Sequence, residues 1–170
     1  MNRMSRKQLI NISLLLLLVV NASCNSRSAS KKNLDGFLSV TKVVDGDTFW
    51  VDDGSSIGEK IRLIGVDAPE SRRNGKKEIG YYGKEAKEYL TNLLTGKKVI
   101  LEFDVGRYDQ YHRTLAYVYL EDGTFLNAEL VKQGYAMVMT VPPNVKFADE
   151  FVKLQQTARE NNNGLWNEQK

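Results

Sequence analysis

The architecture of this chain is set by residues 37–51, Phe-Leu-Ser-Val-Thr-Lys-Val-Val-Asp-Gly-Asp-Thr-Phe-Trp-Val. Apolar and β-branched residues on both sides of Asp45-Gly46-Asp47 predict two strands joined by a tight bend. We expect Gly46 to adopt a positive φ, which would let the chain reverse and bring a carboxylate to the mouth of a small β-structure.

The rest of residues 36–167 continues this pattern. Strands are predicted at 60–66, 99–103 and 114–120, and amphipathic helices at 83–95, 126–133 and 147–159. Leu165 and Trp166 are expected to fold back onto the core. Five short strands with helical cover favour an α+β fold, a five-stranded OB-fold β-barrel with three packed α-helices.

The N-terminus has the layout of a secretory signal. Residues 1–7 are basic, residues 9–20 are apolar apart from Asn11 and Ser13, and the run is short for a membrane span of about 20 apolar residues. We predict a lipoprotein-type signal peptide at 1–23, a flexible tether at 24–35 and one globular domain at 36–167.

Cys24 is the only cysteine, so no disulfide can form within the chain. The small pair Ala22-Ser23 before it resembles a bacterial lipobox, although Asn21 stands where that motif usually carries leucine. We expect an exported monomer, lipid-anchored through Cys24 in the bacterial cell envelope. The alternative is cleavage nearby and release as a secreted protein.

The net charge of +3 does not by itself indicate a polyanionic partner. Three of the 24 Lys and Arg lie in residues 1–23, which hold no acid, so 21 basic residues face 21 acidic ones in the remainder. Attraction for nucleic acid must then come from local clusters. One such cluster consists of Arg72, Arg73, Lys76, Lys77, Lys84 and Lys87, of which Lys84 is the predicted substrate contact.

Several kinds of catalytic site are excluded by composition. One histidine and one cysteine cannot build a His/Cys zinc site, a two-histidine phosphodiesterase or a Cys-His hydrolase. The chain also has neither a G-x-x-x-x-G-K-[ST] nor a G-x-G-x-x-G phosphate loop. Any catalysis must therefore use carboxylates, arginines and oxygen-bound metal.

Two acidic segments offer oxygen ligands for a divalent cation. Asp45 and Asp47 flank the first bend, and Asp67 ends a predicted strand, with Pro69 keeping Ala68 extended so that its carbonyl can face the same cation. Two carboxylates, a carbonyl and waters suit the loose geometry of Ca²⁺ better than the strict octahedron of Mg²⁺. The alternative is a pair of ordinary acidic turns.

Three further side chains suit phosphodiester chemistry. Glu70 can orient or deprotonate an attacking water, and Arg62 and Arg113 can clamp phosphate oxygens in a fork geometry that lysine lacks. Arg62 and Asp67 are an odd number of residues apart, so a regular strand would point them to opposite faces. We expect a bulge or kink near Gly65 to bring them together.

Three blocks resemble the staphylococcal nuclease (thermonuclease) family: Val-Asp-Gly-Asp-Thr at 44–48, Arg-Leu-Ile-Gly-Val-Asp-Ala-Pro-Glu at 62–70 and Tyr-His-Arg-Thr-Leu-Ala-Tyr at 111–117. Residues 130–136 and 164–166 are similar as well. The resemblance spans about 36–167 and implies Ca²⁺-dependent, sugar-nonspecific cleavage of DNA and RNA to 3′-phosphates.

Carried over by position, the resemblance implies Asp47, Asp67 and the Ala68 carbonyl as Ca²⁺ ligands, and Asp45 as an acid near the metal. It implies that Arg62, Glu70 and Arg113 are catalytic and that Tyr111 contacts nucleotide phosphate. Where this chain departs from the family, Gln110 replaces a lysine and residues 139–143 lack the tyrosines on which the base packs.

Two alternatives to an enzyme stay open at this point. The first is a catalytically inactive barrel that binds nucleic acid or protein on the cell envelope, as related domains do after losing catalytic acids. The second is an envelope lipoprotein that uses the barrel for oligosaccharide or protein contact. Because Asp47, Asp67, Glu70, Arg62 and Arg113 are all present, we expect a nuclease.

Overall fold

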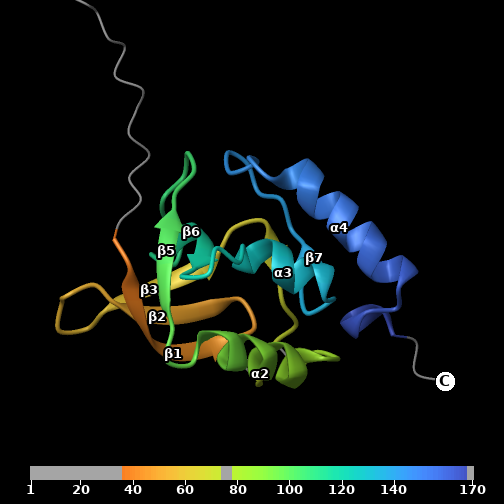
Figure 1. Cartoon of the computed structure of the whole chain (residues 1–170), viewed down its shortest axis with the longest axis horizontal. Coiled ribbons are helices and arrows are strands. Elements are labelled where there is room, and N and C mark those ends of the chain that lie inside the picture. The colour runs from red at the N-terminus through yellow and green to blue at the C-terminus, as the bar shows by residue number, and fades with distance from the viewer. Residues whose placement is uncertain (1–35, 74–77, 168–170) are drawn as a thin grey trace, which may run out of the picture. The chain divides into compact units, whose positions relative to one another are not determined.

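The computed structural model describes residues 36–73 and 78–167 (Figure 1). Five strands close into a barrel in the order β1-β2-β3-β6-β5. All neighbours are antiparallel except β3 and β6, which are parallel. The strands are β1 (Leu38–Asp45), β2 (Thr48–Asp52), β3 (Glu59–Leu63), β5 (Lys98–Glu102) and β6 (Thr114–Leu120).

Three α-helices accompany the barrel: α2 (Gly83–Leu94), α3 (Leu126–Lys132) and α4 (Ala148–Glu160). In α2 the residues at helical spacing, Ala86, Leu90 and Leu94, are completely buried. A 3₁₀ turn, η1 (Gly164–Trp166), follows α4, and Arg159 lies over the Trp166 ring. The predicted α+β barrel with three helices is confirmed.

The third predicted strand is broken, which corrects its predicted extent to residue 66. β3 ends at Leu63, Ile64 and Gly65 form a turn, and the short β4 (Val66–Asp67) pairs with β7 (Met137–Val138) in a separate sheet. Gly65 has a φ of 79°, so the expected kink is present. The buried Asn127 of α3 donates from Nδ2 to the Ile64 carbonyl at 2.9 Å and so holds this turn.

The reason for a glycine at position 46 differs from the prediction. Gly46 is not among the residues with positive φ. A Cβ at this position would lie 2.7 Å from Ala68 Cβ and 3.0 Å from Ala86 Cβ. Glycine is therefore required because the bend between β1 and β2 packs closely against residue 68 and α2.

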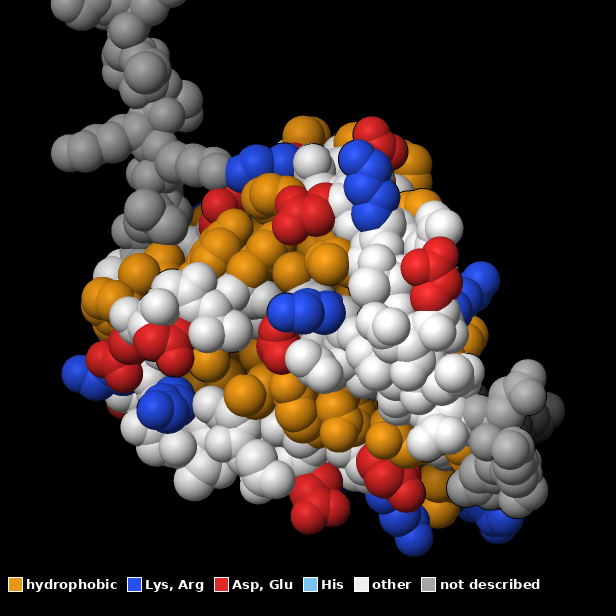
Figure 2. Space-filling model, turned by 45° about the vertical axis from the view of Figure 1, so that its right-hand side comes forward, with side chains coloured by type: hydrophobic (Ala, Val, Ile, Leu, Met, Phe, Trp, Pro, Cys, Tyr) orange, Lys and Arg blue, Asp and Glu red, His pale blue; other side chains and the backbone are white. Residues whose placement is uncertain are grey.

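The predicted signal peptide, tether and Cys24 lie outside the described residues. Of the helices within 36–73 and 78–167, none has both the length and the apolar character needed to cross a membrane. On the face drawn in Figure 2, acidic and basic side chains are interspersed with hydrophobic patches. This mixed distribution agrees with the near balance of charge in the sequence after residue 23.

Candidate active site

One surface pocket brings together most of the predicted site residues. It is formed where the β1–β2 bend, β3, β4, residues 68–72 and residues 111–113 meet. The predicted residues that line it are Asp45, Asp47, Arg62, Asp67, Ala68, Glu70, Tyr111 and Arg113. Lys84 is exposed in the first turn of α2 and does not line this pocket.

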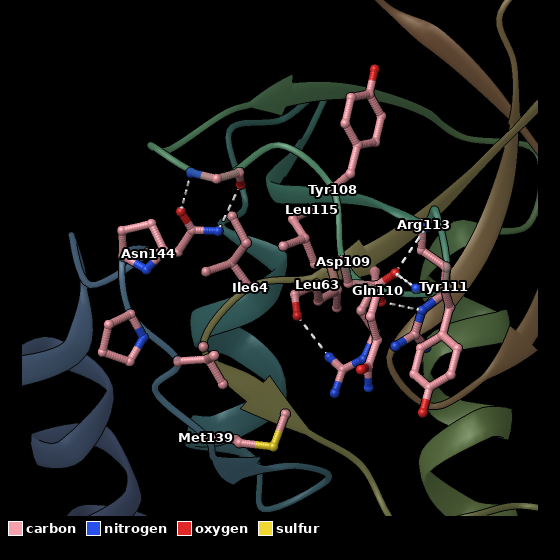
Figure 3. A pocket seen from close by; sticks show the side chains of 16 residues that line it. Leu63, Ile64, Tyr108, Asp109, Gln110, Tyr111, Arg113, Leu115, Met139 and Asn144 are labelled. Carbon is pink, nitrogen blue, oxygen red and sulfur yellow. Dashed lines mark hydrogen bonds and ion pairs between the residues drawn. The ribbon is translucent and has the colours of Figure 1, made fainter.

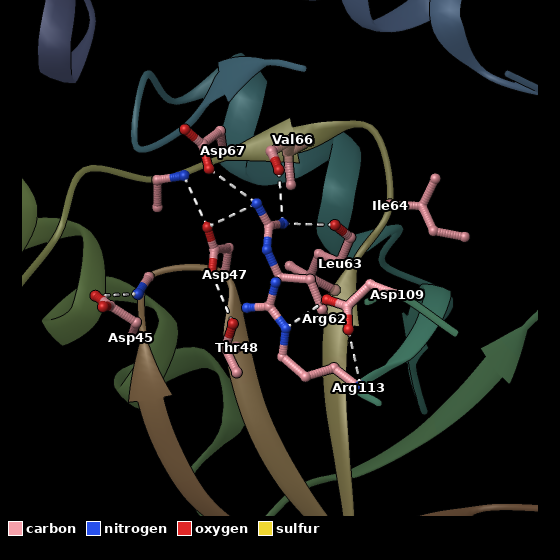
Figure 4. Close-up of polar contacts among 12 residues, drawn as sticks. Asp45, Asp47, Thr48, Arg62, Leu63, Ile64, Val66, Asp67, Asp109 and Arg113 are labelled. Carbon is pink, nitrogen blue, oxygen red and sulfur yellow. Dashed lines mark hydrogen bonds and ion pairs between the residues drawn. The ribbon is translucent and has the colours of Figure 1, made fainter. Parts of the chain in front are cut away.

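Arg62 is the central group of the pocket and is 6% exposed. Its Nη1 donates to the carbonyls of Leu63 and Val66, both at 2.7 Å (Figure 4). Its Nη2 lies 2.9 Å from Asp67 Oδ1 and 3.2 Å from Asp47 Oδ2. The turn at Gly65 makes this arrangement possible, because it re-aims the chain so that Asp67 faces the same side as Arg62.

Asp47 and Asp67 converge on a single positive group. Asp47 Oδ2 and Asp67 Oδ1 both contact Nη2 of Arg62, so the two carboxylates face the same point of the pocket. Asp47 is further fixed by Thr48 Oγ1, which donates to Oδ1 at 2.8 Å, and by the Ala68 N–H, which donates to Oδ2 at 3.0 Å.

The oxygen donors here fit a loosely coordinated hard cation. Within 36–73 and 78–167 there is no group of three or more His, Cys, Asp or Glu residues arranged as a metal site. A cation in this pocket would therefore rest on two carboxylates, with a backbone carbonyl and water supplying the other oxygens. Ca²⁺ tolerates such a shell, whereas softer metals such as Cu²⁺ and Zn²⁺ favour sites with nitrogen or sulfur ligands.

Asp45 positions the segment that carries Glu70. Its Oδ1 accepts hydrogen bonds from the Gly46 N–H at 3.0 Å and from the Ser71 N–H at 3.1 Å. The Glu70 carbonyl accepts from the Gly80 N–H at 2.9 Å, so the peptide group that follows Glu70 is held at both its carbonyl and its N–H. The half-buried Glu70 carboxylate lines the pocket together with Asp47 and Asp67.

Arg113 is oriented by Asp109, to which sequence reasoning gave no role. Arg113 Nε lies 2.6 Å from Asp109 Oδ2, and Asp109 Oδ1 accepts from the N–H groups of Tyr111 and Arg113 at 2.8 and 3.0 Å. Burial raises the pKa of Asp109, but these hydrogen bonds outweigh it and hold the pKa below its ordinary value. The spacing of Asp109 and Arg113, four residues apart, is the sequence feature that could have predicted this ion pair.

Comparison with known proteins agrees with this geometry. The family model described as "Staphylococcal nuclease homologue" matches residues 60–168. This chain belongs to the staphylococcal nuclease family. It is 40% identical over 128 residues to the thermonuclease of Staphylococcus intermedius, a match that covers 75% of this chain and 74% of the relative.

Two other proteins are similar to this chain over comparable lengths. The thermonuclease of Staphylococcus hyicus is 39% identical over 128 residues, covering 75% of this chain and 73% of the relative. The SPbeta prophage-derived endonuclease YokF of Bacillus subtilis is 35% identical over 131 residues, covering 76% of this chain and 43% of the relative.

A second, more apolar groove adjoins the pocket in this family member (Figure 3). It shares Arg62, Tyr111, Arg113 and Met139 with the first pocket. One wall contains Val141, Pro142 and Pro143, where the family resemblance leads one to expect tyrosines.

The buried Asn144 joins the two loops that flank this groove. Its Oδ1 accepts from the Gly106 N–H at 2.7 Å, and its Nδ2 donates to the Gly106 carbonyl at 2.8 Å. Sequence reasoning missed this pair of contacts. They tie residues 139–146 to the loop that leads to Asp109 and Arg113.

Proposed function

We propose that this protein is a Ca²⁺-dependent, sugar-nonspecific nuclease that hydrolyses DNA and RNA and leaves 3′-phosphate products. The observation that carries the proposal is the convergence of Asp47, Asp67, Glu70, Arg62 and Arg113 on one pocket. The names of its relatives, thermonuclease and endonuclease, support the same reaction class.

In this proposal the two arginines bind the scissile phosphate. Arg113, held by Asp109 through Nε, can donate two parallel hydrogen bonds from its Nη groups to phosphate oxygens. Both Nη groups of Arg62 already contact the carbonyls of Leu63 and Val66 and the carboxylates of Asp47 and Asp67, so Arg62 contributes its positive charge and its Nε–H. As water attacks phosphorus, negative charge builds on these oxygens, and fixed cations in a partly buried site stabilise that charge. Asp109 holds Arg113 in place for this contact.

Glu70 acts on the attacking water. Its carboxylate accepts a proton from that water or orients it, while the bond between phosphorus and the 5′-oxygen breaks. The departing 5′-oxygen takes up a proton, and the phosphate remains on the 3′ side. The two hydrogen bonds of the peptide group between Glu70 and Ser71 restrict where this carboxylate can move.

Asp47, Asp67 and the carbonyl of Ala68 are the residues that would hold Ca²⁺. When bound, the cation supplies positive charge that polarises the phosphate and offsets its negative charge. Tyr111, which is 69% exposed beside Arg113, is proposed to contact a substrate phosphate, and Lys84 to supply positive charge at longer range.

The test uses the processed chain, residues 24–170, and denatured DNA. Cleavage is expected in Ca²⁺ and should be lost in chelator and in Glu70→Gln, while the exposed control Glu121→Gln keeps the wild-type rate. Identical digestion under all four conditions would refute the assignment. Loss of cleavage with retained binding of DNA in every condition would instead support an inactive binding module.

We also propose that the protein acts outside the cytoplasm, as a monomer anchored through a lipid on Cys24. This rests on the sequence of residues 1–24 alone. Radiolabelled palmitate should label the wild-type chain in bacteria, and Cys24→Ser should remove the label and release the protein into the medium. Unchanged fractionation of Cys24→Ser would contradict the anchor.

A further inference from the structure

Trp50 faces the candidate active site from the outer side of the barrel. Its neighbours in β2, Phe49 and Val51, are completely buried, and alternation along a strand places Trp50 on the opposite face. The pairing of β2 with β3 sets Thr48 opposite Arg62 and Trp50 opposite Lys60. Trp50 and Lys60 therefore lie on the same face of the sheet as Arg62, two residues further along the strands.

The same pocket extends from the catalytic groups to this pair. Trp50, Lys60 and Arg62 all line it, together with Arg113 and Glu70. Two residues along a strand correspond to about 7 Å. Trp50 and Lys60 thus lie beside Arg62, one of the two arginines proposed to bind the scissile phosphate. The distance is one that a neighbouring nucleotide can span.

Core packing does not account for this tryptophan. Within the described residues, Trp50 belongs neither to the buried core cluster nor to the partly buried hydrophobic side chains packed against it. It is half-buried, and Lys60 Nζ lies 5.9 Å from its ring centroid. A large aromatic ring that is open to the active-site pocket and next to a cation is the arrangement by which proteins hold single-stranded nucleic acid.

We propose that Trp50 stacks on the nucleobase of the nucleotide next to the scissile phosphate, and that Lys60 contacts the phosphate beyond it. This inference rests on the proposed nuclease function and names the part of the substrate that the site recognises. Because every base offers a π-face, the contact gives affinity for single strands without a sequence preference.

The first test compares two substrates of the same length, oligothymidylate and an oligonucleotide whose internal sites are abasic. The wild-type enzyme is expected to prefer the complete substrate in kcat/KM. Trp50→Ala should lower that preference by roughly 5- to 150-fold, the range reported for loss of one base–aromatic stack. Trp50→Phe should keep most of it, which also controls for a folding defect of the alanine variant.

Phe37→Ala is the matched control, because Phe37 is a 52% exposed aromatic residue that does not line the pocket. Its preference should equal that of the wild type. An unchanged preference in Trp50→Ala, with the wild type cleaving normally, overturns the stacking role and leaves the nuclease intact. Absence of cleavage by the wild type overturns both.

A fluorescence measurement gives an independent readout. The chain has two tryptophans, so Trp166→Phe leaves Trp50 as the sole indole reporter. In Trp166→Phe combined with Glu70→Gln, rapid mixing with oligothymidylate in Ca²⁺ should quench the emission saturably. The abasic oligonucleotide should quench it much less. Equal quenching by both substrates, or none by either, contradicts stacking.

Discussion

Arg62 and Asp67 form an ion pair, with Nη2 2.9 Å from Oδ1, in which the arginine side chain is 7% exposed and the aspartate side chain 46% exposed. The buried partner therefore depends on the ion pair and on the carbonyls of Leu63 and Val66 for its hydrogen bonds. The exposed partner remains accessible to a cation or substrate from the pocket. Because Arg62 is buried and Asp67 is exposed, we expect Arg62 to stabilise the fold as well as to take part in the chemistry of the pocket.

Arg62→Lys should lower both stability and activity. Lysine keeps the charge but cannot serve two carbonyls and two carboxylates at once, so we expect a loss of about 2–4 kcal/mol in the free energy of unfolding. Urea denaturation measures this change. Arg73→Lys is the control: the Arg73–Glu78 pair is 71% exposed on both sides and should contribute little. Equal stabilities of the two variants would contradict the structural role of Arg62.

Asp109→Asn should reduce cleavage about 10- to 100-fold, because Arg113 loses its anchoring carboxylate. The pKa of Asp109 is lowered in the folded protein, so its contribution to stability is complete above the unfolded pKa of about 3.9 and is lost as pH falls through the lower folded-state pKa. The stability difference between wild type and variant should thus be constant from pH 7 to 5 and shrink below pH 4. A difference that grows on acidification would contradict this sign.

Gly65→Ala should destabilise the protein by about 2–4 kcal/mol. The residue has a positive φ of 79°, and an added Cβ would lie 2.6 Å from Phe151 Cε2. Gly54→Ala is the matched control, since its φ is 84° but no atom lies within 4 Å of the added Cβ. That variant should lose only about 1–2 kcal/mol. Thermal unfolding of the two variants separates the steric clash from the backbone strain, and equal losses would rule out the clash.

Asn144→Ala should weaken the connection between the two loops that flank the apolar groove. It removes both hydrogen bonds to Gly106 from a buried site, which we expect to cost about 2–3 kcal/mol and to lower kcat because the loop carrying Arg113 is less well held. Asn144→Asp keeps the acceptor for the Gly106 N–H but places a carboxylate oxygen against the Gly106 carbonyl in a buried site, so its stability should fall at least as far as that of Asn144→Ala. Wild-type kcat in Asn144→Ala would show that the loop holds its position without this link.

The features predicted correctly from sequence have a strong local pattern. Alternation and helical spacing predicted the five strands and three helices, and the family resemblance supported their closure into a barrel. The parity conflict between Arg62 and Asp67 located the kink at Gly65. The positive φ expected at Gly46 was wrong, because the demand for glycine there comes from Ala68 and Ala86, which are distant in sequence. No local pattern contains that information.

The missed features depend on contacts between distant segments. β4 and β7 have two residues each, too few to show alternation, and they pair only because the turn at Gly65 directs the chain toward Met137. Asn144 and Gly106 are 38 residues apart and meet where two loops leave the closed barrel. The position of Trp50 beside Arg62 likewise required the register of β2 with β3.

The dependence of cleavage rate on Ca²⁺ concentration in Asp67→Asn tests the central claim most directly. Asparagine keeps an Oδ1 acceptor for Arg62 Nη2, and the Asp67 side chain is 46% exposed, so the substitution should leave the fold intact, while Asp47 remains as a single charged ligand. We predict that half-maximal cleavage of denatured DNA requires at least about tenfold more Ca²⁺ than in the wild type. Superimposable Ca²⁺ curves for the two proteins would contradict a cation held between Asp47 and Asp67.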